Sequence, residues 1–328
     1  MNRRYRIVAP TLGMASFIES DFALLRERHE VREVPVATVA GQVRALLALA
    51  SADLVLLWFG STRFLPVALA ARLMGRPVVI ITGGYDVVSE PGIAYGNMRG
   101  GLPRLLGRAV FRTAAAVACI SEAIRHDVVT LARVPERQAH LIPLGFPAGP
   151  EPLKRREPIV LTVAFGDESS IHRKGLMDVA RASRLLPDLR FVMVGRFTDP
   201  ARRLVVEAGG SNLELPGYVS NDRLAELMQS AAVYYQPSLH EGFGCSVAEA
   251  MLAGCVPVVT RRGSLPEVVG DAGLYVEPRD VSGQAVAVRA ALDRAGSEHP
   301  RRRILAHFPV DRRCHRLLQL LDYAMEGQ

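Results

Sequence analysis

The sequence predicts an α/β protein built from two doubly wound parallel sheets, and three observations support this. Short β-branched runs alternate with longer helical patterns along most of the 328 residues, which is typical of parallel sheets covered by helices on both faces. A segment with four prolines in thirteen residues, 146–158, interrupts the alternation. The length also favours two domains, because single cores stop growing at roughly 250–300 residues.

The expected elements follow this alternation. In the first half we expect strands at 5–10, 53–59, 77–82 and 115–121, with helices between them, such as those over 22–29, 65–75 and 102–115. Prolines fit neither a sheet centre nor a helix interior, so 146–158 is predicted to link two domains. After it come strands at 158–165, 189–195, 212–217, 233–238, 256–260 and 273–278. Helices at 174–186, 201–209, 221–231 and after Ser246 separate them, and a helical tail follows.

These elements suggest a first domain at 1–148 and a second at 149–305. The helix within 306–328 is expected to pack back toward the first domain. Doubly wound sheets bind ligands outside the carboxyl ends of their strands, so we expect a ligand cleft between the domains.

Composition excludes several classes of protein. The four cysteines form no C-x-x-C pair, which argues against a zinc site or a disulfide framework and favours a reducing cytoplasm. There is no signal segment at the start and no run of about 20 apolar residues. Aromatic residues make up 6 %, which argues against stacking platforms for single-stranded nucleic acid.

Charge is unevenly distributed. Residues 1–150 contain 17 arginines, no lysine and 11 acidic residues, a net charge of +6, whereas residues 151–328 have a net charge of +1. A basic first half suits phosphates or an anionic membrane surface, although it could also be ordinary solvated charge. No nucleic-acid-binding motif accompanies it, so a nucleic-acid partner is not expected.

The segment HEGFGCSVAEAML contains two acidic residues around a glycine-rich turn. Gly242 and Gly244 allow a ligand to approach the backbone, and the helix start that follows suits a phosphate. Glu241 stands at the carboxyl end of a strand, where a carboxylate can accept hydrogen bonds from sugar hydroxyls. Ser246 and Glu249 fit a capping box, which would explain Glu249 without any ligand.

A second candidate site is SSIHRKGLMDVA, where His172, Arg173 and Lys174 are expected at the start of a helix. Positive charge is unfavourable at that end of a helix, so a bound anion would explain these residues better than stability does. A solvated basic turn is the alternative. Lys174 is one of only two lysines, and a compact ammonium suits a diphosphate.

The stretch EGFGCSVAEAMLAGCVPVV resembles the E-x7-E signature of retaining glycosyltransferases of the GT-B fold, in family four, the glycosyl transferases group 1. The similarity extends from about 159 to 280 and includes VMVGRF and GSLPEVVGDAGLYVEP. The resemblance implies two Rossmann-like domains facing a central cleft. It also implies transfer of a sugar from a nucleotide diphosphate sugar to an acceptor hydroxyl, with retention, in polysaccharide, glycolipid or glycoconjugate biosynthesis.

The resemblance also implies roles for single residues. Lys174 would neutralise the leaving diphosphate, Glu241 would hold hydroxyls of the donor sugar, and Glu249 would hold the ribose. The remaining donor-binding residues would be Arg173, Val219, Gly242, Phe243, Gly244, Cys245 and, in the first domain, Gly13. Asp86 is the only first-domain acid placed for catalysis.

The sequence departs from the family pattern at three places. An arginine usually stands a few residues before the lysine, but AFGDESSIHRKG offers only Arg173. A first-domain histidine is replaced by GGYDV, with Tyr85 and Asp86, and the loop PTLGMASF has a single glycine, Gly13. A nucleotide-sugar epimerase of the same fold, or a degenerate sugar-nucleotide binder, therefore remains an alternative.

The expected partners follow from the same resemblance. We expect a nucleotide diphosphate sugar as donor and a glycan, lipid or small molecule as acceptor. The sequence has no D-x-D motif, so neither a metal ion nor a separate cofactor is expected. The protein is expected in the cytoplasm, with peripheral contact at the anionic inner face of a membrane.

Overall fold

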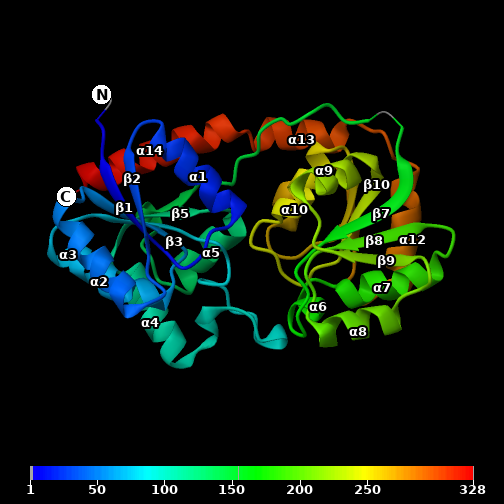
Figure 1. Ribbon diagram of the computed structural model, residues 1–328, viewed down its shortest axis with the longest axis horizontal. Helices are drawn as coiled ribbons and strands as arrows, with labels where there is room; N and C mark the ends of the chain where they lie inside the picture. The colour runs from blue at the N-terminus through cyan, green and yellow to red at the C-terminus, as the bar shows by residue number, and fades with distance from the viewer. Residues whose placement is uncertain (1–2, 154, 328) are drawn as a thin grey trace. The chain divides into compact units, whose positions relative to one another are not determined.

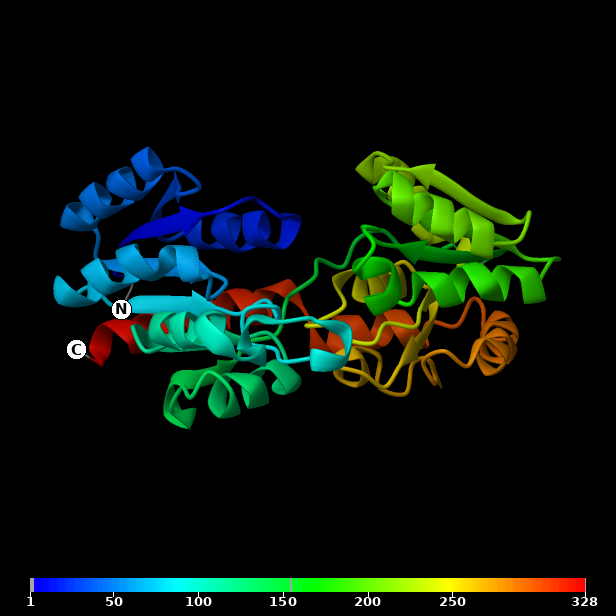
Figure 2. The same ribbon diagram turned by 90° about the horizontal axis from the view of Figure 1, so that it is seen from below.

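The structure is a computed structural model that describes residues 3–153 and 155–327. It divides into two compact units, Met1–Gly145 with Val310–Gln328 and Phe146–Pro309. In the described residues each unit contains one six-stranded sheet whose neighbouring strands all run parallel (Figure 1, Figure 2). The predicted α/β class with two doubly wound sheets is confirmed.

The first unit has the strand order β2-β1-β3-β4-β5-β6. Its strands are β1 (Arg6–Thr11), β2 (Glu30–Pro35), β3 (Leu54–Trp58), β4 (Val78–Ile81), β5 (Ala114–Cys119) and β6 (Ala139–Leu141). Its helices are α1 (Ser16–Arg26), α2 (Val39–Ala48), α3 (Leu65–Leu73), α4 (Gly101–Phe111), α5 (Glu122–Thr130) and α14 (Val310–Glu326). Every residue of β3 and β4 is buried, as expected for central parallel strands.

Two strands of this sheet, β2 and β6, are absent from the sequence-based expectation. Both are edge strands. The sequence of β2, EVREVP, mixes charged and apolar residues, and Glu30, Arg32 and Pro35 are exposed. An edge strand needs no continuous apolar run, so the criterion used for the buried strands does not detect it.

A buried arginine on helix α14, Arg313, connects this helix to the rest of the first unit through an ion pair and hydrogen bonds. Arg313 forms an ion pair with Asp21 of α1, and both side chains are 2 % exposed. Its Nη1 also donates to the carbonyl oxygens of Ile142 (2.8 Å) and Pro143 (3.0 Å). Trp58 Nε1 donates to Asp21 Oδ2 at 3.0 Å. The buried charges are therefore paired and hydrogen-bonded, as burial requires.

The second unit has the strand order β12-β11-β10-β7-β8-β9. Its strands are β7 (Glu157–Val163), β8 (Arg190–Val194), β9 (Leu213–Gly217), β10 (Ala231–Gln236), β11 (Val256–Thr260) and β12 (Leu274–Val276). Its helices are α6 (Ser170–Arg173), α7 (Leu176–Leu185), α8 (Asp199–Ala208), α9 (Asn221–Ser230), α10 (Cys245–Leu252), α11 (Leu265–Val269), α12 (Val281–Leu292) and α13 (His299–His307). The chain reverses its direction across the sheet between β7 and β10, and such switch points are where open α/β sheets bind ligands.

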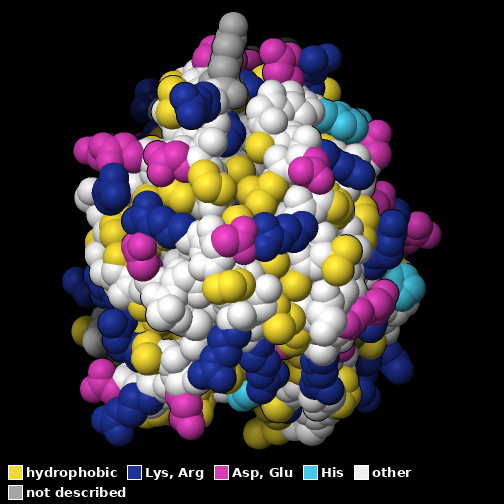
Figure 3. All heavy atoms as spheres, turned by 90° about the vertical axis from the view of Figure 1, so that its right-hand side faces the viewer, with side chains coloured by type: hydrophobic (Ala, Val, Ile, Leu, Met, Phe, Trp, Pro, Cys, Tyr) yellow, Lys and Arg dark blue, Asp and Glu magenta, His cyan; other side chains and the backbone are white. Residues whose placement is uncertain are grey.

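The surface of the second unit is mixed in charge. Figure 3 shows one face on which acidic and basic side chains lie interspersed, with apolar atoms in small patches between them.

No helix among residues 3–153 and 155–327 is long and apolar enough to cross a membrane.

Candidate active site

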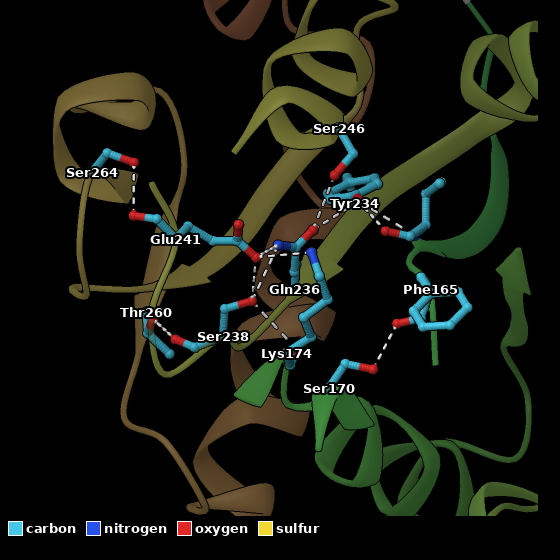
Figure 4. Close-up of polar contacts among 11 residues, drawn as sticks. Phe165, Ser170, Lys174, Tyr234, Gln236, Ser238, Glu241, Ser246, Thr260 and Ser264 are labelled. Atoms are coloured by element: carbon cyan, nitrogen blue, oxygen red, sulfur yellow. Dashed lines mark hydrogen bonds and ion pairs between the residues drawn. The ribbon is translucent and has the colours of Figure 1, made fainter. Parts of the chain in front are cut away.

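The candidate site lies in the second unit, at the carboxyl ends of the two strands that flank the switch point. Lys174 follows β7, in the turn between α6 and α7, and Glu241 follows β10. The Lys174 Nζ lies 3.1 Å from Glu241 Oε1, and the two side chains are 19 % and 11 % exposed (Figure 4). The fold thus joins in one ion pair two residues that the sequence analysis selected independently.

The Lys174 turn is held by backbone contacts with the segment before Glu241. The Leu239 amide donates to the Arg173 carbonyl at 2.7 Å. Gly175 has φ +68°, and a Cβ there would lie 2.3 Å from the Pro237 carbonyl oxygen. This position therefore requires glycine, both for its backbone conformation and for the close packing.

The expectation that His172, Arg173 and Lys174 begin a helix is wrong in detail. His172 and Arg173 end the short helix α6, Lys174 is its C-cap, and α7 begins after Gly175. Cations at the end of a helix are favourable. The dipole argument for a bound anion therefore fails, and the ion pair with Glu241 takes its place as the evidence for function.

Glu241 is held ionised in a largely buried position. Its Oε1 accepts from Gln236 Nε2 (2.6 Å), Ser238 Oγ (3.0 Å) and Lys174 Nζ (3.1 Å). Desolvation would raise the pKa of this carboxyl, but the charges of Lys174 and Arg173 and the hydrogen bonds from Lys174 and Ser238 outweigh it, so the pKa is lowered. All three of these contacts reach the same oxygen, Oε1 (Figure 4).

The main chain at Glu241 is fixed by the loop before α11. Ser264 donates to the Glu241 carbonyl oxygen from its amide (3.1 Å) and from its Oγ (3.2 Å). A Cβ on Gly263 would lie 2.2 Å from the same oxygen. Gly263, at φ +55°, lets this loop approach the carboxylate segment closely.

A buried hydrogen-bond chain behind Glu241 was missed by the sequence analysis. Gln236 donates to Glu241 and to Ser238 Oγ (3.1 Å), and its Oε1 accepts from Tyr234 Oη (2.9 Å) and Ser246 Oγ (3.2 Å). Gln236 and Ser238 are fully buried. Two buried polar residues at the end of an otherwise apolar strand are the sequence signal that could have revealed this chain.

Glu249 proves not to be part of a capping box. Helix α10 begins at Cys245 with Gly244 (φ +90°) as its N-cap, and Ser246 lies inside the helix with its Oγ on Gln236. The Glu249 carboxylate has no hydrogen-bond or ion-pair partner in the part of the chain that the structure describes. The residue is exposed, yet surrounding protein atoms desolvate the carboxyl and raise its pKa to about 7. Helix capping therefore does not explain this acid.

The glycine-rich turn supplies backbone rather than side chains. Gly242, Gly244 and Cys245 lead directly into α10, whose first N–H groups lack intrahelical partners. Phe243 is 4 % exposed, and its ring packs on Phe146 and Phe308 at centroid distances of 5.8 and 5.4 Å. The ring therefore belongs to the packed interior of the second unit and is not available to a ligand.

Val219 follows β9 at the edge of the sheet, two strands from β7. It is half-buried. Next to it, Tyr218 is exposed and the Arg196 guanidinium lies 4.7 Å from its ring centroid. A flat cationic and aromatic pair of this kind suits a planar base.

In the first unit, Asp86 is 3 % exposed. Its Oδ2 accepts from the Gly60 amide (2.8 Å), and its Oδ1 accepts from the amides of Gly83 (3.2 Å) and Gly84 (2.9 Å). Desolvation raises the pKa of this carboxyl, and the three amides oppose that shift. The geometry supports a structural role for Asp86, as the link between the loops after β3 and β4, better than the catalytic role expected from the sequence.

The Asp86→Asn variant distinguishes these two roles. We expect it to lower the melting temperature, because the amide nitrogen would face one of the backbone N–H groups and leave a buried donor unpaired, at a cost of about 1–3 kcal/mol. Below the unfolding transition we expect kcat close to that of the wild type. Asp293→Asn, at an exposed position, is the matched control. A collapse of kcat in folded Asp86→Asn protein would instead support catalysis.

Gly13 lies in an exposed loop beside a hollow of about 370 Å³. The hollow is lined by Pro10, Thr11, Leu12, Gly13, Met14, Ala15, Ile18, Trp58 and Phe59. It lies at the carboxyl ends of β1 and β3, the switch point of the first sheet. A Cβ on Gly13 would meet nothing within 4 Å, so donor binding by Gly13 stays a prediction.

The described residues contain neither a cluster of metal ligands nor a disulfide bond. No group of three or more His, Cys, Asp or Glu side chains within 3–153 and 155–327 could hold a metal ion. The four cysteines, Cys119, Cys245, Cys255 and Cys314, form no disulfide bonds within these residues.

Comparison with known proteins places this site in a family context. Residues 158–294 match the family model of glycosyl transferases group 1. Two curated relatives are mannosyltransferases. The chain is 31 % identical to the MMP alpha-(1->4)-mannosyltransferase of Mycolicibacterium hassiacum over 183 residues, an alignment that covers 53 % of this chain and 44 % of that protein. It is 36 % identical to O-antigen chain mannosyltransferase B of Escherichia coli over 118 residues, an alignment that covers 33 % of this chain and 31 % of that protein.

These matches span less than half the length of both curated relatives. The fold is similar to that of Anabaena Alr3699/HepE, solved in complex with UDP and glucose. The TM-score is 0.76 at 16 % identity, over 97 % of this chain and 100 % of that chain. The likeness confirms the GT-B type of fold expected from the sequence, while the central cleft stays a prediction.

Proposed function

Residues 158–294 match the family model of glycosyl transferases group 1, and from this match we propose that the chain is a retaining glycosyltransferase of that family. It would transfer a sugar from a nucleotide diphosphate sugar to an acceptor hydroxyl in glycan or glycoconjugate biosynthesis. The observation that supports this most is the ion pair between Lys174 and Glu241 at the switch point of the second sheet. A second observation is Glu249 on α10, an acid whose pKa is raised by desolvation.

Each of these three side chains has a distinct task in this proposal. The ammonium of Lys174, with Arg173 and the first N–H groups of α10, stabilises negative charge on the departing diphosphate. Such electrostatic stabilisation is usually the largest single contribution to catalysis. The second carboxylate oxygen of Glu241, Oε2, accepts hydrogen bonds from the donor sugar, and the Glu249 carboxylate accepts them from the ribose. The base stacks near Tyr218 and Val219.

Retention follows in this proposal from attack on the same face that the diphosphate leaves. The acceptor hydroxyl forms the new bond to the anomeric carbon as the bond to the diphosphate breaks. The hydroxyl proton passes to a phosphate oxygen of the leaving group. No enzyme nucleophile is needed, and we propose that neither a metal ion nor a separate cofactor takes part.

The comparisons favour a hexose as the transferred group. Both curated relatives are mannosyltransferases, so we propose mannose first, while the UDP and glucose of the structural neighbour keep a glucose donor as the next candidate. The acceptor would bind at the hollow of the first unit. Its lining residues are uncharged and mostly apolar, so an apolar part of the acceptor should enter there. The cysteines without disulfide bonds support a reducing cytoplasmic setting, and the basic first half supports a position beside an anionic membrane.

The experiment that tests this proposal is a thermal-shift screen of the protein with nucleotide diphosphates and their sugars. A ligand at 100 times its dissociation constant stabilises the folded state by about 2.7 kcal/mol. We expect GDP-mannose or a UDP-hexose to raise the melting temperature and to release its nucleotide diphosphate when acceptor is added. Stabilisation without turnover would favour the degenerate sugar-nucleotide binder, and no shift with any nucleotide would contradict the proposed donor site.

A further inference from the structure

Helices α2 and α3 of the first unit reverse the usual arrangement of surface helices. Inward they bury mostly small residues, with Gly41, Ala45 and Ala48 on α2 and Val67, Ala68 and Ala71 on α3. Outward they expose large aliphatic residues: Val39, Val43, Leu46 and Leu47 on α2, and Leu69 and Leu73 on α3. Val39 is 81 % exposed, Leu47 72 % and Leu73 87 %. A surface helix of a globular protein normally carries polar residues on its outer face.

The two helices form one surface, which we call the α2–α3 face. They are in contact within the same layer, as Figure 1 shows. On α2 the exposed positions 39, 43, 46 and 47 recur at the spacing of one side of a helix. Single exposed leucines are common, but several together on neighbouring helices indicate an interaction surface.

Charge on and around the α2–α3 face has one sign. Arg44 and Arg72 lie on the two helices and Arg63 just before α3, and all three are exposed. Between Glu33 and Asp86 the sequence contains only one acid, Asp53. Asp53 is paired with Arg6, and Glu33 with Arg26. The face therefore combines exposed aliphatic side chains with arginines and no unpaired acid, in contrast to the interspersed charges of the second unit (Figure 3).

We infer that the α2–α3 face binds the surface of an anionic membrane, with its aliphatic side chains entering the headgroup region and its arginines contacting lipid phosphates. Aliphatic residues flanked by arginines are the combination that binds anionic interfaces. A second copy of the chain would bring arginines against arginines, which complementary surfaces avoid. The inference does not depend on the donor chemistry, because none of these residues belongs to the candidate active site.

Cosedimentation of the full chain with sucrose-loaded vesicles tests the inference. We expect binding to phosphatidylcholine vesicles that contain phosphatidylglycerol and much weaker binding to phosphatidylcholine alone. Binding should weaken as salt rises from about 0.1 M to 1 M, where the Debye length falls from about 10 to 3 Å. Arg44→Gln should lower the affinity about fivefold, which corresponds to about 1 kcal/mol for one basic residue at such a surface.

The aliphatic contribution is tested with Leu47→Ser/Leu73→Ser and with Leu47→Glu/Leu73→Glu. Both positions are exposed, so the fold should survive, and circular dichroism checks this. We expect both variants to bind anionic vesicles on the order of tenfold or more weakly, as lost apolar burial predicts. Val286→Glu, at a 69 % exposed position on α12 of the second unit, is the control and should bind normally.

Three results would overturn the inference. The first is undiminished vesicle binding by the folded Leu47→Glu/Leu73→Glu variant, and the second is no vesicle binding by the wild type. The third is a stable wild-type dimer, seen by analytical ultracentrifugation, that the Leu47→Glu/Leu73→Glu substitutions dissociate. The α2–α3 face would then be an interface between copies of the chain.

Discussion

The Lys174→Ala variant is expected to transfer sugar about 10²- to 10³-fold more slowly than the wild type, the loss typical when one group that stabilises developing negative charge is removed. In the proposed reaction the Lys174 ammonium lies next to the departing diphosphate, and a methyl group cannot replace its charge. Steady-state kcat/KM with the donor identified by thermal shift is the measurement. Near-normal turnover would show that the diphosphate binds elsewhere.

The control for this variant is Arg203→Ala, which removes one positive charge from an exposed position of the same unit and should leave kcat/KM unchanged. Lys174→Ala should also melt at a lower temperature, because Glu241 loses an ion-pair partner. The pKa of Glu241 is lowered in the folded protein. Its ionisation therefore stabilises the fold above the unfolded value of about 4.3, and this contribution is lost as pH falls through the folded pKa. The stability gap between variant and wild type should shrink on acidification.

The Glu249→Gln variant is expected to bind the nucleotide about 10- to 100-fold more weakly, because hydrogen bonds to a charged acceptor contribute about 1.5–3 kcal/mol. Its melting temperature should not fall, since the wild-type carboxylate has no protein partner in the described residues to lose. Isothermal titration with the nucleotide diphosphate measures the affinity. Glu241→Gln is the matched control, and it should keep free-nucleotide affinity while losing sugar transfer.

The raised pKa of Glu249 predicts how stability and nucleotide affinity depend on pH. The folded pKa of about 7 lies above the unfolded value of about 4.3, so the fold disfavours the charged form. Wild-type stability should therefore decline relative to Glu249→Gln as pH rises from about 4 to about 7 and then level off. Nucleotide affinity of the wild type should fall below pH 7, as the carboxylate becomes protonated. Equal affinities in wild type and variant at every pH would deny Glu249 a role in binding.

Much of the fold was predictable from local pattern. The apolar runs that became β3, β4 and β10 are continuous because both faces of a central parallel strand are buried, and every residue of these three strands is buried. The edge strand β2 was not found, because an edge strand tolerates charged residues and needs no continuous apolar run.

The candidate site was predictable only in part. Lys174, Glu241 and Glu249 are recognisable from residue type and from the resemblance to known glycosyltransferases. The roles of their neighbours are not. From the sequence, Asp86 was expected to be a catalytic acid, but its carboxylate accepts hydrogen bonds from three backbone amides. Phe243 reads as part of the donor turn, but its ring packs on Phe146 and Phe308.

The sequence by itself determined the α/β class, the order of most strands and helices, and the acidic and basic residues from which a donor site can be built, because these depend on local periodicity and on residue chemistry. Only the tertiary structure decided which residues act together. It pairs Lys174 with Glu241, which lie 67 positions apart in the sequence, and it places Gln236 in hydrogen-bond contact with Glu241. It also starts α10 at Cys245, so that Glu249 does not form the capping box that the sequence suggests. Strand order and loop contacts bring these residues together, and neither can be derived from a short segment of the sequence.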